Sequence, residues 1–154
     1  MRNLEQKYHC TDRAQAEAAA LAIGATDRGV LHQRDLFFSA PQARLKLRIT
    51  YDREGGELIA YNRSDTDGAR ISEYTVAPVS DAGAMIVVLT QALGPPRELV
   101  KTRRLFLYKS TRIHLDKVEG VGTFVELETV LTHQSQAAAE GELAEIVTAL
   151  RIEE

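Results

Sequence analysis

The stretch RLKLRI, residues 44–49, carries a cation at every second position and a leucine or isoleucine between the cations. In a β-strand successive side chains point to opposite faces, so this segment has one apolar face and one wholly cationic face. Like charges on one face repel each other unless water or an anion surrounds them. The segment is therefore either a strand with a solvated side or a strand whose cations gather around something negative.

The same alternation recurs in other segments. The residues that would share a face are Asn3, Glu5 and Lys7; Tyr61 and Arg63; Lys101 and Arg103; Arg112, His114 and Asp116; and Glu126 and Glu128. A half-exposed antiparallel sheet commonly carries charge on its wet side, but we would expect Thr, Ser and Gln to be mixed with it. Buried charges are costly unless they are paired or neutralised by a ligand. The pattern therefore favours a closed barrel with a polar interior that holds a polyanion and a divalent metal ion.

Turn and capping signals divide the chain into eight expected strands and three expected helices. Asp81 is a candidate helix cap and Gly94 a helix end, and DREGG and SDTDG have hairpin turn chemistry. Short turns favour antiparallel neighbours. The expected strands cover residues 2–9, 28–38, 43–51, 57–63, 70–77, 97–108, 112–118 and 123–131, and the helices 11–25, 81–93 and 136–150. These elements predict an α+β domain over residues 1–154, built on one large antiparallel sheet that is either open or closed.

Composition excludes several classes of protein. The 154 residues suit a single domain, and the net charge of −3 gives no sign of nucleic acid or an anionic membrane as partner. The single cysteine, Cys10, cannot form an internal disulfide, and this fits a reducing compartment. The first ten residues lack the apolar core of a secretory signal, and the longest apolar run is too short to span a bilayer. We therefore expect a cytoplasmic protein with neither membrane nor nucleic acid as partner.

The ordered set of motifs resembles the CYTH superfamily, also called triphosphate tunnel metalloenzymes, and is most similar to the branch labelled class IV adenylyl cyclase. NLEQK (3–7) resembles the ExExK strand of the family, QRDLFF (33–38) its QxDxYF motif, and RLKLR (44–48) its basic strand. LIAYNR (58–63) resembles LIxYxR, and VKTRRLF (100–106) resembles the VxKxR strand. The longest match is RIHLDKVEGVGTFVELE (112–128), which resembles RxHLDxVxGLGxFxEIE. Together the motifs span residues 2 to 131.

The resemblance implies an eight-stranded antiparallel tunnel with flanking helices, in which basic side chains bind a triphosphate and acidic side chains bind Mg²⁺ or Mn²⁺. The implied metal ligands are Glu5, Asp116, Glu126 and Glu128. The implied phosphate-binding residues are Lys7, Arg44, Lys46, Arg48, Arg63, Lys101, Arg103 and Arg112, and Lys7 and Arg48 are the candidates for a direct catalytic role. The chain departs from the family at Asn3, where the first glutamate of ExExK is replaced by a neutral amide. This departure weakens a second metal site.

The resemblance implies an enzyme of the adenylyl cyclase type, which converts ATP to cyclic AMP and pyrophosphate. A triphosphatase acting on tripolyphosphate, a nucleoside triphosphate or thiamine triphosphate would use the same site. A non-catalytic binder of polyphosphate or nucleotide is a further alternative, which the replacement at Asn3 supports, and a structural domain with a charged exterior is another. A homodimer is plausible by resemblance only.

Two residues keep open roles. His114 could be a general base, a metal neighbour or a hydrogen-bonded interior histidine, and the last is preferred. Tyr61 could stack on a base or pack in the tunnel wall.

Overall fold

The computed structural model describes residues 1–64 and 68–152. In these residues the chain forms eight strands and three helices, as the sequence predicted. Their bounds are β1 Arg2–His9, α1 Arg13–Ala22, β2 Thr26–Phe38, β3 Arg44–Thr50, β4 Gly56–Arg63, β5 Arg70–Val79, α2 Ala82–Leu93, β6 Arg97–Tyr108, β7 Thr111–Val118, β8 Gly122–Val130 and α3 Gln136–Leu150.

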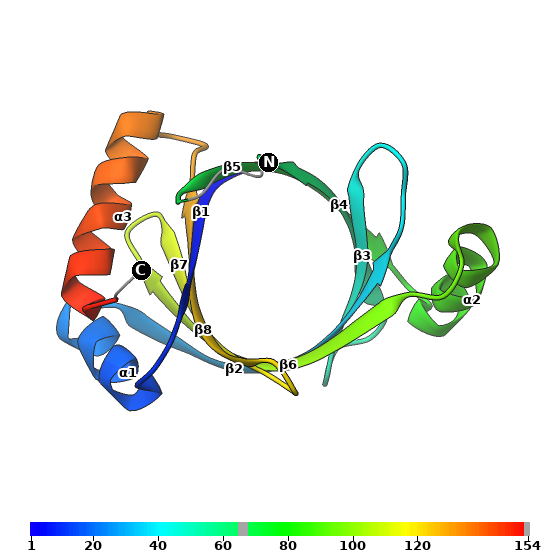
Figure 1. Cartoon of the computed structure of the whole chain (residues 1–154), viewed down its shortest axis with the longest axis horizontal. Helices are drawn as coiled ribbons and strands as arrows, with labels where there is room; N and C mark the ends of the chain where they lie inside the picture. Colours follow the sequence, from blue (N-terminus) through cyan, green and yellow to red (C-terminus); the bar gives the residue numbers. More distant parts are fainter. Residues whose placement is uncertain (65–67, 153–154) are drawn as a thin grey trace.

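The eight strands close into a barrel in the order β1-β5-β4-β3-β2-β6-β7-β8 (Figure 1). Every neighbouring pair is antiparallel, and β1 closes the ring by pairing with both β5 and β8. A closed sheet has no unpaired edge and separates its residues into an inner set and an outer set. The prediction of an α+β fold with a closed antiparallel barrel is therefore confirmed.

The helices begin and end at the residues whose chemistry favours those positions. The side chains of Asp12 and Asp81 accept hydrogen bonds from the backbone N–H groups of Gln15 and Ala84 at 3.0 and 2.9 Å. Such caps satisfy N–H groups that have no partner inside the helix. Helix α2 ends at Gly94, whose φ of +87° is accessible to glycine at little cost.

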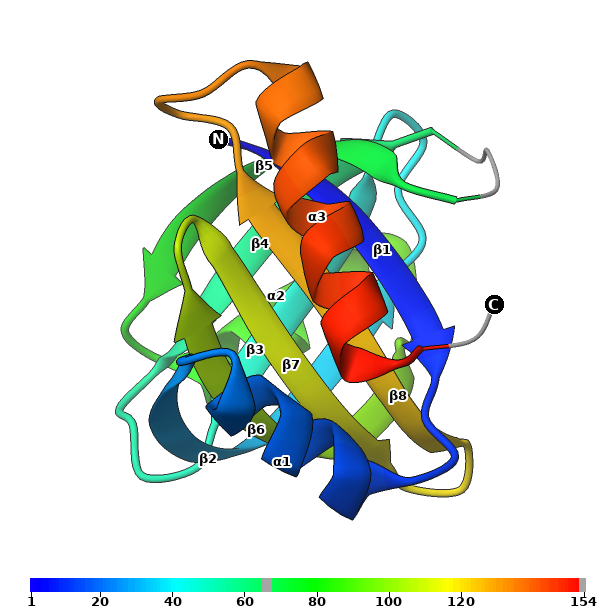
Figure 2. The ribbon, with the colours of Figure 1, turned by 90° about the vertical axis from the view of Figure 1, so that its left-hand side faces the viewer.

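Two apolar layers pack against the outside of the barrel. Helices α1 and α3 lie over β1, β7 and β8, and their core includes Leu4, Leu115 and Ile146 (Figure 2). Helix α2 lies on the opposite side against β2 and β3, where Leu45, Leu47 and Ile49 contact its apolar face. The leucines and the isoleucine of RLKLRI therefore face outward, beneath a helix. Each layer fixes which residues of its strands must face the interior.

The predicted boundaries differ from the observed ones by a few residues. Helix α1 is shorter than the segment 11–25, because Asp12 is its N-cap and Ile23 its C-cap. Strand β2 is longer than expected because it pairs with the 12-residue β6 as far back as Thr26, and β5 is longer because Pro78 and Val79 pair with the start of β4. The DREGG turn is present, and a Cβ added at Gly55 would lie 2.0 Å from the Val79 oxygen. The centre of the SDTDG turn, residues 65–67, lies outside the described residues.

In the described part of the chain, no helix combines the length and the apolar character needed to cross a membrane.

Candidate functional site: a charged tunnel with a carboxylate–histidine cluster

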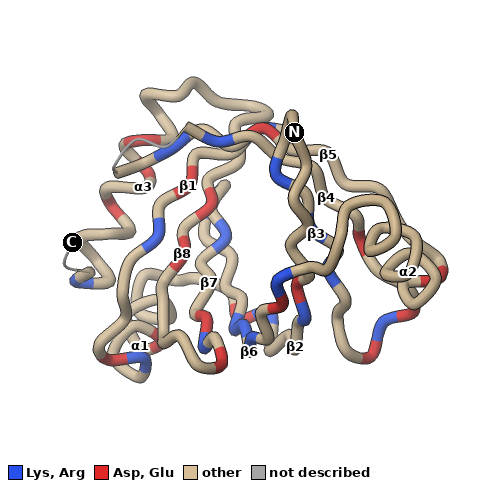
Figure 3. Tube along the Cα trace, turned by 45° about the vertical axis from the view of Figure 1, so that its right-hand side comes forward, with Lys and Arg blue, Asp and Glu red and all other residues tan. Residues whose placement is uncertain are grey.

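The barrel encloses a cavity of about 770 Å³ that receives side chains from all eight strands. Arg44, Lys46 and Arg48 line it, so the cations of RLKLRI face inward and the solvated-strand interpretation is excluded. Ten Lys and Arg residues and six Asp and Glu residues line the cavity, an excess of four positive charges in a chain whose net charge is −3. Figure 3 shows both signs of charge following the strands around the opening. The interior is suited to an anionic ligand.

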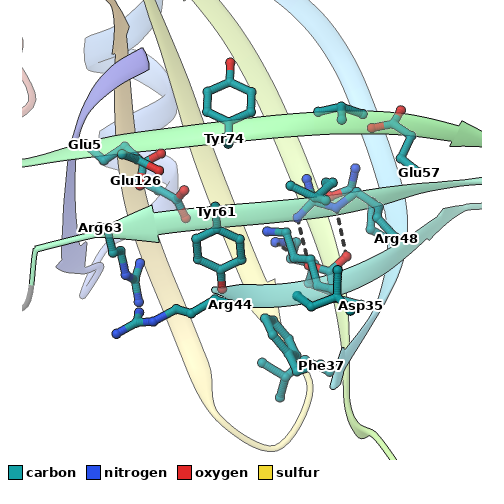
Figure 4. Close-up of a pocket in the computed structure, with 18 of the residues that line it drawn as sticks. Glu5, Asp35, Phe37, Arg44, Arg48, Glu57, Tyr61, Arg63, Tyr74 and Glu126 are labelled. Atoms are coloured by element: carbon teal, nitrogen blue, oxygen red, sulfur yellow. Dashed lines mark hydrogen bonds and ion pairs between the residues drawn. The ribbon is translucent and has the colours of Figure 1, made fainter. Parts of the chain in front are cut away.

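Carboxylates hold two of the interior arginines in fixed positions. Asp35 accepts from Nε and Nη2 of Arg48 at 2.8 and 2.7 Å (Figure 4), and Asp116 accepts from the same two atoms of Arg103 at 2.7 Å each. Lys101 lies between the two carboxylates, 3.4 Å from Asp35 and 3.8 Å from Asp116. Asp35 and Asp116 are only 2% and 1% exposed. These five residues form a buried chain of ion pairs across β3, β2, β6 and β7, which we call the ion-pair chain.

The ion-pair chain shifts the pKa values of its members. Burial by itself would raise the pKa of Asp35, but the hydrogen bonds and the charge of Arg48 hold it well below the ordinary value. Burial lowers the pKa of Lys101 to about 8, and the neighbouring Arg103 and Arg48 contribute to this shift. Asp35 therefore stays ionised, whereas Lys101 is a weakened cation at neutral pH.

A second group of side chains forms a potential metal site. His114, Glu126 and Glu128 each offer a ligand atom, and these atoms lie within 4.8 Å of one another. The register of β7 and β8 produces this arrangement, because His114 lies opposite Glu126 and Glu128 is two residues further along β8. Nδ1 of His114 is buried and has no hydrogen-bond partner. Two carboxylates and an orphaned imidazole nitrogen are a donor set that fits a divalent cation.

Charge in this cluster is unevenly distributed. Burial would raise the pKa of Glu126, but Arg103 and other neighbouring cations hold it well below the ordinary value. Burial and the adjacent charge of Glu126 raise the pKa of Glu128 to about 7. Burial, together with Arg103, keeps the pKa of His114 well below its ordinary value, so its ring is neutral. A neutral imidazole and a carboxyl group that is ready to lose its proton suit the binding of a metal ion.

The remaining predicted acidic ligands lie in different surroundings. Glu5 is opposite Glu128 in the register of β1 and β8, and burial and the charge of Glu126 raise its pKa, so it lies beside the cluster. Asp116 lies outside the cluster, because both of its oxygens bind Arg103. Asp116 therefore forms an ion pair with Arg103, and its role as a metal ligand stays a prediction.

Asn3 and Arg112 explain how the departure from the family motif is accommodated. With its amide oriented to satisfy both ends, Asn3 donates to the backbone oxygen of Arg2 and accepts from Nη2 of Arg112, each at 3.0 Å. Arg112 also donates from Nε to Glu128 at 3.1 Å. The amide oxygen of Asn3 is thus bound to a cation, and this interaction competes with any role of Asn3 as a metal ligand.

Three other predicted phosphate-binding residues differ from those in the ion-pair chain. Among the described residues, Lys7, Lys46 and Arg63 form no salt bridge within 4.0 Å. The ammonium group of Lys7 instead lies 4.6 Å from the ring centre of Phe124, and that of Lys46 lies 5.2 Å from the ring centre of Tyr61. Nε of Arg63 is buried without a hydrogen-bond partner. We call these three residues the open cations. Arg44 lines the same cavity.

Sequence reasoning did not assign a role to Asp35, and it preferred a hydrogen-bonded interior role for His114. His114 is buried, its Nδ1 has no hydrogen-bond partner and lies 3.9 Å from Glu128, and the hydrogen-bonded interior role stays a prediction. The alternation of RIHLD carried the signal, because it placed His114 on the same face as Arg112 and Asp116. The cavity is also lined by Arg53, Glu57 and Arg97, which the sequence did not single out.

Known structures share this architecture. The PH1012 protein of Pyrococcus horikoshii has a TM-score of 0.87 at 16% identity, covering 99% of this chain and 92% of its own. A candidate adenylate cyclase of Vibrio parahaemolyticus has a TM-score of 0.75 at 16% identity, covering 97% and 88%. The Pct1 RNA triphosphatase of Schizosaccharomyces pombe has a TM-score of 0.53 at 12% identity, covering 97% and 78%. At these identities the likeness is one of fold.

Sequence comparison identifies the family. No curated protein matches the chain by sequence. The CYTH domain, by contrast, matches over residues 1–154. The match spans every strand that contributes to the tunnel and both groups of carboxylates within it. The chain therefore belongs to the CYTH domain family.

Proposed function

We propose that this chain is a divalent-metal-dependent enzyme that acts on a triphosphate inside the tunnel. The observation that carries the proposal is that one cavity contains both the cluster of His114, Glu126 and Glu128 and the open cations. A triphosphate would neutralise the cations, and a metal ion would link its oxygens to the carboxylates. Two structural relatives carry names of triphosphate chemistry, adenylate cyclase and RNA triphosphatase, and these names agree with the proposal.

The side chains of the tunnel have distinct tasks in this proposal. The open cations Lys7, Lys46 and Arg63 bind phosphate oxygens and offset their charge. Arg48 binds Asp35 through Nε and Nη2, so its Nη1 is the edge that can donate to a phosphate from a fixed position. Preorganised donors of this kind stabilise charge that develops in a transition state.

The carboxylate–histidine cluster would hold the metal ion, with Glu5 beside it. An ion bound there supplies Lewis-acid stabilisation of phosphate oxygens. Because the cluster offers an imidazole nitrogen as well as oxygens, Mn²⁺ fits its donor set better than Mg²⁺, which prefers oxygen ligands. We therefore expect Mn²⁺ to support activity at lower concentrations than Mg²⁺.

Two reactions are compatible with this site. In the cyclase reaction the ribose 3′-oxygen attacks the α-phosphorus, loses its proton and displaces pyrophosphate. In the triphosphatase reaction a water oxygen attacks the terminal phosphorus and the shortened phosphate chain leaves. The motif resemblance favours the cyclase, with the triphosphatase as the alternative.

A metal-dependent assay with ATP and tripolyphosphate, which resolves cyclic AMP from orthophosphate, tests the proposal. Cyclic AMP supports the cyclase, whereas orthophosphate alone supports the triphosphatase. Glu126→Gln should lower turnover at least 100-fold without unfolding the protein, while Glu54→Gln, in the exposed turn between β3 and β4, should leave turnover unchanged. Absence of turnover with both substrates, or full activity in Glu126→Gln, would contradict the proposal.

A further inference from the structure

Helix α2 is uncharged on every side, although it lies on the surface. Residues 82–96 contain no charged side chain, in a chain where 27% of the residues are charged. Among the residues of α2, all of which the structure describes, none is buried, whereas α3 buries four of its residues. A helix that is apolar all round is normally covered all round, and an exposed apolar patch commonly marks a site of interaction. The exposed side of α2 is therefore a candidate contact surface.

The two sides of α2 have different surroundings. The inner side packs against the barrel through Met85, Ile86, Leu89 and Leu93. The outer side is exposed, and Val87 and Val88 at its centre are 56% and 57% accessible to solvent. We call this side the outer face of α2, and it consists of Gly83, Ala84, Val87, Val88, Gln91 and Ala92.

The outer face is symmetrical about the middle of the helix. The midpoint of α2 (Ala82–Leu93) lies between Val87 and Val88. Two copies related by a two-fold axis at this point would run antiparallel and overlap along the whole helix, over about 18 Å. Val87 would then lie opposite Val88 of the second copy, with the small residues of the outer face on both sides. Small side chains allow two helix axes to approach to about 8 Å.

The absence of charge restricts what can cover this face. A partner that placed a charged side chain against it would bury that charge without a counterion, at high cost. A second copy presents the same uncharged face and avoids this cost. A helix that lies on a membrane surface typically carries Lys and Arg on its polar side, and α2 contains neither residue. Charge complementarity therefore favours a second copy of the chain.

We propose that the outer face of α2 is the interface of a two-fold symmetric dimer of this chain. A single pair of short helices buries less than the roughly 1,200 Å² of a standard stable interface, so the dissociation constant should be of the order of 100 µM. Helix α2 lies outside the barrel wall and does not cross the barrel opening (Figure 1). The dimer thus leaves the tunnel accessible, and the inference does not depend on what the tunnel binds.

Sedimentation velocity of the full chain, from about 10 µM to about 1 mM, tests the inference. The wild-type protein should shift from monomer to dimer over this range. Val88→Glu should weaken association at least tenfold, because it places two carboxylates beside the two-fold axis. Leu21→Glu is the matched control, since it replaces a leucine of α1 that is 52% exposed, and it should leave association unchanged.

Cross-linking keeps the test decisive if Val88→Glu does not fold, which thermal melting would reveal. With a short bis-maleimide, Val88→Cys should give more cross-linked dimer than the wild-type protein, whose single cysteine is Cys10, and Leu21→Cys should not. A wild-type protein that stays monomeric up to about 1 mM would overturn the inference. So would a dimer that Val88→Glu does not weaken, or a cross-linking yield of Val88→Cys that equals that of Leu21→Cys.

Discussion

The tunnel contains two kinds of cation that the sequence does not distinguish. Arg48, Lys101 and Arg103 lie within 4.0 Å of the buried carboxylates of Asp35 or Asp116, whereas the half-buried Lys46 lies over the ring of Tyr61. A buried cation with a carboxylate partner contributes to a folded arrangement that is broken at high cost. A buried cation without such a partner destabilises the fold unless a ligand supplies the charge. The cations that are paired with carboxylates therefore stabilise the barrel, and the cation without such a partner is available to bind an anion.

The largest effect should come from removing a carboxylate of the ion-pair chain. Asp35→Ala leaves Arg48 and Lys101 buried without this partner, so the free energy of unfolding should fall by about 3–5 kcal/mol. Urea denaturation measures the change. Asp27→Ala, which removes a surface partner of Arg104, is the control and should have a much smaller effect. Equal losses in the two variants would show that the ion-pair chain does not support the fold.

Removing an open cation should weaken ligand binding without reducing stability. Lys46→Met should weaken tripolyphosphate binding by about 10- to 100-fold, which corresponds to the loss of one charge-assisted contact. Its melting temperature should stay the same or rise, since burial already lowers the pKa of Lys46 and no carboxylate of residues 1–64 and 68–152 lies within salt-bridge distance. Lys117→Met, at an exposed position of β7, is the matched control. A large loss of stability with unchanged binding would remove the distinction between the two kinds of cation.

The acidic cluster should make the metal-free protein sensitive to pH. The folded-state pKa of Glu128 is about 7, above the ordinary value of 4.5, so between these values the folded state holds a proton that the unfolded state has lost. Glu128 should therefore reduce stability as the pH rises from 5 to 8, by about 1–3 kcal/mol relative to Glu128→Gln. Denaturation curves of both proteins in a chelator, at several pH values, measure this difference. A constant difference between the two proteins would contradict the assigned shift.

The fold was predictable because its signals are local and repeated. The alternation in RLKLRI and RIHLD defined the inner and outer faces, and Asp81 and Gly94 marked the ends of α2. The inward direction of the cations could not be derived from one strand alone, since it depends on the outer helices that cover Leu45 and Leu47.

The separate roles of the site residues were harder to predict from the sequence. Whether a cation meets a carboxylate depends on register between strands that are distant in the chain, as for Asp35 on β2 with Lys101 on β6. The role of His114 likewise depends on its register with Glu126 and on the absence of a partner for its Nδ1. Alternation identifies which residues share a face, but only the closed barrel determines which of them meet.

The acidic cluster and the open cations should act together on one ligand inside the tunnel. A crystal structure of the protein soaked with Mn²⁺ and tripolyphosphate, with anomalous data that locate manganese, tests this claim most directly. We predict a manganese peak in contact with Glu126, Glu128 and His114, and phosphate density that extends from it to Lys46. Manganese bound only at the outer surface, or phosphate density outside the barrel, would contradict the account.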